Sequence, residues 1–177
     1  MGAPDILPAA ATEGFKDASA YDAYRPSYPS EAVESFLKHL KIAGQANLNV
    51  IEIAAGTGKF TELLSARHEN FDIVAVEPHA GMRNQLVDKN LRNVQALDGH
   101  AAKLPVTDMW GDACIAAQAF HWYGCSVSST GNHVLIQPPR FATEETLREV
   151  HRALKPKAVF GMIWNIEDCK LKPSAIQ

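Results

Sequence analysis

The chain has 177 residues, a length typical of a single domain. Hydrophobic residues make up 46% of the sequence and charged residues 21%, which argues against global disorder. The formal net charge of −3 argues against a nucleic-acid partner, and no apolar run is long enough to predict a transmembrane helix.

Cysteine usage and the start of the chain indicate the setting of the protein. The 3 cysteines form no CxxC pair, and their odd number argues against a disulfide framework and a zinc site. The first residues are apolar but lack a basic region, which argues against a signal peptide. We therefore expect a reduced, cytoplasmic protein without a membrane partner, whose oligomeric state the sequence does not indicate.

The N-terminal part of the chain predicts a flexible arm, an extended segment and a helix. Residues 1–14 show no periodicity and predict the arm, so the expected domain covers residues 15–177. The prolines and tyrosines of YDAYRPSYP at residues 21–29 favour an extended segment, after which Pro29 is expected to begin a helix that stops near Gly44. The helix is predicted from an apolar stripe: Ala32, Val33, Phe36, Leu37 and Leu40.

The rest of the chain predicts alternating strands and helices. Short apolar segments predict strands at residues 50–54, 71–76, 94–97, 112–117 and 158–164. Helices are expected from Phe60 to about Arg67, from His79 to Lys89, and from a cap at Thr143 through Leu147, Val150 and Leu154 to Lys155–Pro156. This alternation predicts an α/β fold, a doubly wound and mostly parallel sheet with helices on both faces. Residues 124–140 break the rhythm, and we expect an atypical insertion there.

A glycine turn after the first predicted strand is typical of nucleotide-binding turns. Its sequence, EIAAGTGK from Glu52 to Lys59, lets the backbone approach a ligand closely and adopt positive φ. It lacks the Gly-Lys-Ser/Thr of a Walker A loop and the third glycine of GxGxxG. Glu77 follows the second predicted strand, at an offset from Gly56 that allows a carboxylate to accept both ribose hydroxyls. Although a tight turn and a solvated acid are the alternatives, the two features together favour a nucleoside-containing cofactor.

Further motifs follow along the chain in a fixed order: VIEIAAGTGKFT, VAVEPHAGM, DGHAAKLP, DACIAAQAFHWY and LREVHRALKPKAVFGMIWN. Together they resemble the successive motifs of class I S-adenosylmethionine-dependent methyltransferases, in particular the methyltransferase domain 11 type. The segment YDAYRPSYP is similar to the one that precedes the first helix in that family. The resemblance implies a Rossmann-like methyltransferase fold, S-adenosylmethionine as the cofactor and a small-molecule substrate that the sequence does not identify.

The resemblance also implies a set of cofactor-binding residues, by their positions in the motifs: Tyr24, Arg25, Glu52, Ala54, Gly56, Gly58, Glu77, Met82, Asp98, Ala101, Ala102 and Gln118. In the family the first motif encloses the methionine part of the cofactor, and the acid after the second strand binds the ribose. Met82 and the 101–102 loop match positions near the adenine, for whose amino group Asp98 is an alternative acceptor. Tyr24 and Arg25 match an N-terminal cover, in which a cation meets the cofactor carboxylate.

The end of the fourth predicted strand carries the candidate catalytic residue. Gln118 and His121 match positions that face the cofactor and the substrate in the family. His121 is a candidate general base for a hydroxyl acceptor, and its packing against the following helix is the alternative. The remaining histidines have no HxH or HExxH spacing, so no metal is expected.

Three positions depart from the family pattern. Ala54 stands where the first glycine is usual, and a methyl group is tolerated there if φ is negative, at some cost in cofactor affinity. Ala102 stands where an acid is common, and Lys157-Ala158 replaces a Gly-Gly pair before the fifth strand. The first two changes affect expected cofactor contacts, whereas the third concerns folding.

Two other functions stay open at the level of the sequence. A nicotinamide-dependent oxidoreductase is disfavoured because the third glycine is missing. A non-catalytic or degenerate module is the second alternative, because family members continue past the fifth strand with a helix and an antiparallel hairpin whereas this sequence stops at Gln177. We therefore expect a methyltransferase that is truncated at its C-terminus and impaired in activity.

Overall fold

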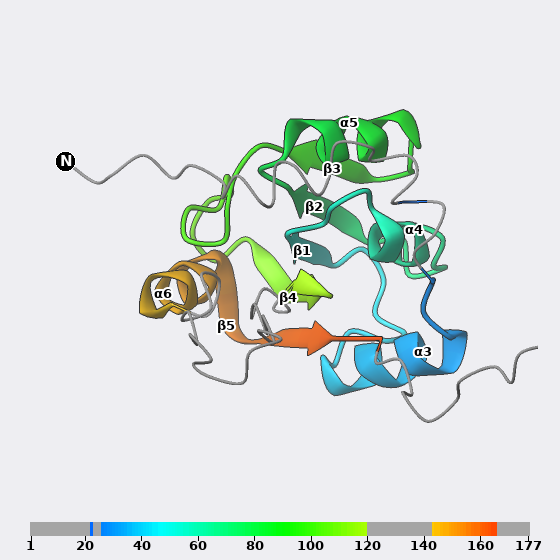
Figure 1. The fold of residues 1–177 in the computed structure, drawn as a ribbon. Coiled ribbons are helices and arrows are strands. Elements are labelled where there is room, and N and C mark those ends of the chain that lie inside the picture. Colours follow the sequence, from blue (N-terminus) through cyan, green and yellow to red (C-terminus); the bar gives the residue numbers. More distant parts are fainter. Residues whose placement is uncertain (1–21, 23–25, 120–142, 166–177) are drawn as a thin grey trace, which may run out of the picture.

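Helices and strands alternate along the chain in the computed structural model, which describes residues 22, 26–119 and 143–165. The elements run in this order: α3 (Ser30–His39), β1 (Asn49–Ile53), α4 (Lys59–Ser65), β2 (Asp72–Val76), α5 (Ala80–Asp88), β3 (Val94–Leu97), β4 (Gly111–Ala117), α6 (Glu144–Ala153) and β5 (Leu154–Ile163) (Figure 1). The predicted alternation is confirmed. The expected arm at 1–14 and the expected insertion at 124–140 lie outside the described residues.

The strands form one parallel sheet in the order β3-β2-β1-β4-β5. The chain runs from β1 outward to β2 and β3, and then crosses to the other side of β1 for β4 and β5. This reversal confirms the predicted doubly wound α/β fold. In such a sheet, ligands bind outside the carboxyl ends of the strands near the point of reversal, which here lies between β1 and β4.

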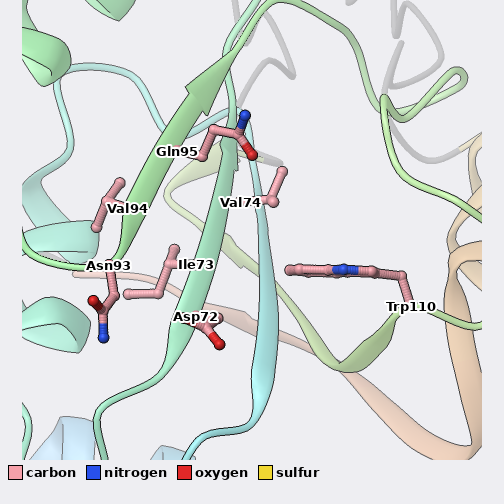
Figure 2. A pocket seen from close by; sticks show the side chains of 7 residues that line it. All are labelled: Asp72, Ile73, Val74, Asn93, Val94, Gln95 and Trp110. Carbon is pink, nitrogen blue, oxygen red and sulfur yellow. The ribbon is translucent and has the colours of Figure 1, made fainter.

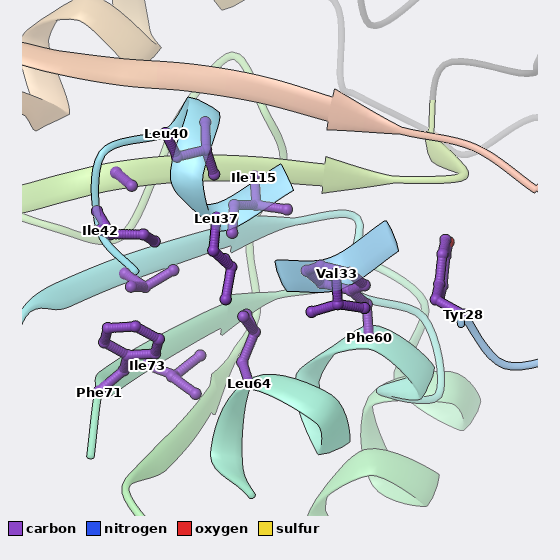
Figure 3. Packing of buried hydrophobic residues seen from close by; sticks show 12 residues of the cluster. Tyr28, Val33, Leu37, Leu40, Ile42, Phe60, Leu64, Phe71, Ile73 and Ile115 are labelled. Carbon is purple, nitrogen blue, oxygen red and sulfur yellow. The ribbon is translucent and has the colours of Figure 1, made fainter. Parts of the chain in front are cut away.

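Both faces of the sheet are covered, which explains why the central strands are almost continuously apolar. On one face, α3 and α4 pack against β2 and β4 in a cluster that includes Leu37, Phe60, Leu64, Ile73 and Ile115 (Figure 3). On the other face, the described core contains α6 and the loop after β3, as these residues illustrate: Ile51, Val74, Leu104, Cys114 and Val150. In the part of the chain that the structure describes, a ligand is therefore expected at the strand ends or the edges of the sheet.

Both ends of α3 and the start of β5 differ from those predicted. Pro29 is the N-cap of α3 (φ −58°, ψ 139°) and not its first residue, and α3 ends at His39, before Gly44. The fifth strand begins at Leu154, because Lys155 directly precedes Pro156 and favours extended backbone, so α6 does not continue past Ala153. Leu147 is 53% exposed, since Thr146 takes the inward position of that turn in α6.

Three asparagines form a ladder at the amino ends of β1, β2 and β3. Asn47, Asn70 and Asn93 have left-handed φ values of 57°, 56° and 55°. The Asn70 side-chain amide donates to Asn47 Oδ1 (3.1 Å) and that of Asn93 donates to Asn70 Oδ1 (2.9 Å), each across 23 residues of sequence. Asparagine is one of the few residues other than glycine that visits this conformation readily. Each of these left-handed residues therefore directs the chain into the strand that follows it, and the ladder joins the three turns at the edge of the sheet opposite the glycine turn.

Candidate cofactor site

The predicted glycine turn connects β1 to α4 at the carboxyl edge of the sheet. Gly56 and Gly58 have φ values of 59° and 85°, the left-handed region that favours glycine. A Cβ at Gly58 would collide with the Leu86 side chain, so that position requires glycine for space as well. The turn is closed by hydrogen bonds from Gly58 N to Ala55 O (2.9 Å) and from Ala55 N to Val76 O (3.1 Å). It therefore presents a fixed backbone at the end of β1.

Ala54 does not meet the condition under which a methyl group is tolerated at this position, because its φ is 52° and not negative. The chain leaves β1 at this residue and must turn so that Ala55 N reaches Val76 O on β2. A residue with a Cβ costs roughly 1–2 kcal/mol in the left-handed region. The same reason explains the second glycine replacement, since Lys157 has a φ of 71°. Glycine is usual at both places because the backbone there is left-handed.

Glu77 lies at the carboxyl end of β2 and faces the glycine turn. Its side chain is buried, with Oε2 accepting from Gly56 N (2.9 Å) and Oε1 accepting from His79 N (2.8 Å). Burial raises the pKa of this carboxyl, and the two backbone N–H groups oppose the rise. Each carboxylate oxygen has a further lone pair, which is what an acceptor of ribose hydroxyls needs. Its ribose role stays a prediction.

Glu52 is the second buried acid of the site and precedes the last residue of β1. It is 1% exposed, and Thr61 Oγ1 donates to its Oε2 (2.8 Å). Burial raises the pKa of this carboxyl to about 8, with the nearby Glu77 adding to the rise. Glu52 is therefore largely protonated at neutral pH, and it lies behind the turn as a neutral hydrogen-bonding group.

The residues predicted near the adenine lie around the second and third strand ends. Met82 is buried, and its Sδ lies 3.7 Å from the position that a Cβ of Gly56 would take. Ala101 is buried and Ala102 is half-buried in the loop after β3. Asp98 is exposed and forms an ion pair with Arg83 (3.1 Å), so its carboxylate has a cationic partner. Met82 is thus beside the glycine turn, whereas Asp98 points to α5.

Gln118 follows β4 and is directed toward the end of β5. Its φ is 56°, and its backbone N–H donates to Ile163 O (2.9 Å). Its side-chain amide donates to the carbonyl of Asn165 (3.2 Å). The structure therefore gives Gln118 a role in joining two strand ends, and a contact with cofactor stays a prediction. Tyr24, Arg25 and His121 lie outside the described residues.

Sequence reasoning missed a polar cluster beside the turn. Thr57, between the two glycines, donates through Oγ1 to Asp22 Oδ1 (2.6 Å). Lys89 Nζ also contacts Asp22 (2.9 Å) and forms an ion pair with Glu62 on α4 (2.5 Å). Asp22 belongs to the YDAYRPSYP segment, so the family motif pointed to the segment but not to this residue.

The structure also has a hollow away from the glycine turn. An open hollow at the amino ends of the strands is lined by Asp72, Ile73, Val74, Asn93, Val94, Gln95 and Trp110 (Figure 2). These residues begin β2 and β3 or precede β4, so the hollow is at the opposite ends of the strands from Glu77.

Within the described ranges, no group of His, Cys, Asp and Glu side chains is arranged to hold a metal ion. None of the helices described has the length and apolarity needed to cross a membrane.

Known proteins similar to this chain identify its family. The profile of the Methyltransf_11 family, a methyltransferase domain, matches residues 51–162. An uncharacterised methyltransferase of Mycobacterium tuberculosis is 35% identical over 152 residues, which are 86% of this chain and 51% of that protein. An uncharacterised methyltransferase-like protein of Schizosaccharomyces pombe is 32% identical, also over 86% of this chain and 51% of its own length. The chain thus spans about half the length of these curated relatives.

Solved structures share the fold. A SAM-dependent methyltransferase from Aquifex aeolicus superposes with a TM-score of 0.58 at 24% identity, over 89% of this chain and 78% of that chain. The DhpI–SAM–HEP complex superposes with a TM-score of 0.56 at 27% identity, over 85% of this chain and 62% of that chain. The profile match and the sheet order together show that this chain belongs to the Methyltransf_11 family of S-adenosylmethionine-dependent methyltransferases.

Proposed function

We propose that this chain binds S-adenosylmethionine at the glycine turn and transfers a methyl group to a small-molecule acceptor. The observation that carries the proposal is the hydrogen bond between Gly56 N and Glu77 Oε2 (2.9 Å). It joins the turn after β1 to the acid after β2, which are the two parts that a nucleoside must contact together. Family membership and the S-adenosylmethionine bound by DhpI, a relative in fold, support the choice of cofactor over a nicotinamide.

The chemistry of the described residues fits this cofactor. A ribose diol needs a carboxylate with further lone pairs, and each oxygen of Glu77 accepts one hydrogen bond from a backbone N–H group. A flat adenine needs apolar side chains, which Met82 and Ala101 supply. The methionine part needs close approach to the backbone, which the left-handed turn at Gly56 and Gly58 supports. Tyr24, Arg25 and Gln118 are proposed as further contacts, with Ala102 and Asp98 at the adenine edge.

The proposed mechanism depends on positioning and exclusion of water. When bound, the cofactor supplies a methyl group that its sulfonium already activates. The chain therefore needs to hold the acceptor in line and keep water out, and it needs no nucleophile of its own. Glu52, protonated and buried behind the turn, adds no negative charge there at neutral pH. His121 is proposed as the base for a hydroxyl acceptor, whereas a carboxylate acceptor requires none.

The class of acceptor and the setting are inferred from the composition. A net charge of −3 does not favour a polyanionic substrate, which supports a small molecule over nucleic acid. A cytoplasmic location is part of the proposal and rests on the odd number of cysteines without a CxxC pair. A non-catalytic cofactor-binding module is the alternative, supported by the left-handed alanine in the glycine turn.

Calorimetry with this chain tests the proposal. We expect S-adenosylmethionine and S-adenosylhomocysteine to bind and NAD not to bind. Glu77→Ala is expected to weaken binding by about 1.5–3 kcal/mol, the range for a hydrogen bond to a charged group. Glu145→Ala, at an exposed position of α6, is the matched control and should bind like the parent. Binding of NAD alone would refute the cofactor, and parental affinity in Glu77→Ala would refute the ribose role.

A transfer assay separates the enzyme from the binding module. The parent chain is incubated with radiolabelled S-adenosylmethionine and a panel of small carboxylic acids and phenols. Transfer of label to a panel member supports the proposed function. Cofactor binding without transfer to any carboxylic acid, phenol or other small acceptor favours the non-catalytic alternative.

A further inference from the structure

We propose that Asp22 is a positioning residue of the cofactor site, acting through Thr57 to hold the glycine turn in its binding conformation. This inference rests on the proposed function. Asp22 Oδ1 accepts from Thr57 Oγ1 at 2.6 Å and from Lys89 Nζ at 2.9 Å. The contacts join residues that are 35 and 67 positions apart in the sequence. They are therefore tertiary contacts that form only in the folded chain.

The cluster differs from an ordinary surface ion pair in its burial. The Thr57 residue is 1% exposed, and the side chains of Lys89 and Asp22 are 12% and 19% exposed. Exposed ion pairs contribute little because water screens them, whereas a charged hydrogen bond in a partly buried site is stronger. Lys89 is also held by Glu62 on α4, so Asp22 is tied to a cation that is itself fixed. Asp22 thus has a defined position beside the turn.

Thr57 connects this cluster to the part of the turn that meets the cofactor. It is the one residue of the turn, 54–58, that has a polar side chain. Its neighbours Gly56 and Gly58 are both left-handed, and glycine alone does not restrict the backbone to that region. The Thr57–Asp22 hydrogen bond therefore adds a side-chain anchor to the backbone hydrogen bonds that close the turn.

The direction of the Gly56 N–H group is what the anchor controls. That N–H donates to Glu77 Oε2, the carboxylate assigned to the ribose. If Thr57 Oγ1 loses its contact with Asp22, the backbone angles of Gly56 are less restrained, and the alignment between Glu77 and the Ala55–Gly56 peptide, which carries the Gly56 N–H group, changes. Asp22 touches no cofactor atom in this proposal, so its effect on binding passes through Thr57.

Calorimetry with S-adenosylhomocysteine tests the inference in the 177-residue chain. Thr57→Val removes the hydroxyl at nearly constant shape, Thr57→Ser keeps it, and Asp22→Ala removes the acceptor. We expect Thr57→Val and Asp22→Ala each to weaken binding about tenfold, the effect of losing one charged hydrogen bond. Thr57→Ser is expected to stay close to the parent. The double variant Asp22→Ala/Thr57→Val is expected to match the weaker-binding single variant, because both changes remove the same contact.

A stability control separates positioning from general destabilisation. Glu69→Gln disturbs a buried ion pair with Arg67 before β2, away from the glycine turn. It is expected to lower the melting temperature while leaving the affinity for S-adenosylhomocysteine unchanged. Additive effects of Asp22→Ala and Thr57→Val, or parental affinity in both, would overturn the inference. So would a loss of affinity in Glu69→Gln equal to theirs at an equal melting temperature. If the parent itself does not bind, the proposed function fails and not this inference alone.

Discussion

The left-handed alanine in the glycine turn gives the sharpest test of the backbone argument. Replacing Ala54 by glycine removes a Cβ from a residue with φ 52° and relieves roughly 1–2 kcal/mol. Two costs oppose this gain, about 0.5–1 kcal/mol for the greater freedom of glycine in the unfolded chain and less than about 0.8 kcal/mol for a half-buried methyl group. The net change in the free energy of unfolding is therefore small, and a control must isolate the φ contribution.

Ala55→Gly is the matched control, because this neighbour is also an alanine but is not left-handed. Ala55→Gly loses a methyl group and gains freedom in the unfolded chain, but it relieves no left-handed Cβ. It is therefore expected to be less stable than Ala54→Gly by at least about 1–2 kcal/mol. Urea denaturation of the two variants and the parent measures the difference. Equal losses of stability in Ala54→Gly and Ala55→Gly would refute the reasoning, since the φ of residue 54 would then have no energetic consequence.

Three further predictions concern the rest of the fold. Asn70→Gly keeps the left-handed turn and loses only the ladder, so it should be more stable than Asn70→Ala, which loses both, by about 1 kcal/mol in urea denaturation. The Arg67 guanidinium lowers the pKa of buried Glu69 to about 2, from 4.5, so the resulting stability is present above pH 4.5 and lost as the pH falls toward 2. This contribution is on the order of 3 kcal/mol. In urea denaturation at a series of pH values, the free energy of unfolding of Glu69→Gln should therefore depend less on pH than that of the parent. Parallel curves for the two proteins would contradict the prediction. Deleting residues 124–140 is expected to leave the melting temperature unchanged or slightly raised, because shortening a connection lowers the entropic cost of closing it only slightly. A deletion variant that does not fold would show that the segment is structural.

Local patterns predicted much of the fold because the signals for strands and helices lie within short windows. The apolar runs that became β1 and β2, and the glycines and Glu77 that follow them, are of this kind. The left-handed φ of Ala54 was not predicted, because nothing in an alanine signals the backbone that the β1–β2 pairing imposes. The extended start of β5 was missed for a similar reason, since Leu154 continues the helical stripe of α6 in sequence.

Contacts across the chain were beyond sequence reasoning for a different reason. Asn47, Asn70 and Asn93 are far apart in sequence, and they meet only because β1, β2 and β3 are adjacent in the sheet. Asp22 also meets Thr57 only in the folded chain, across 35 residues of sequence. A single sequence shows the residue types in these contacts but not their distances, and so it identified the motifs around Asp22 and not Asp22 itself.

Burial raises the pKa of both buried acids of the site, and their hydrogen bonds oppose that rise to different extents. Glu77 receives two backbone N–H groups, which favour its charged form and partly offset burial. Glu52 receives a single hydroxyl, that of Thr61, and its pKa rises to about 8. The charged form of Glu77 therefore receives more hydrogen-bond donation than that of Glu52. The two N–H groups favour the carboxylate form of Glu77, which is the acceptor that a ribose diol requires, and the protonation of Glu52 avoids a buried negative charge behind the glycine turn.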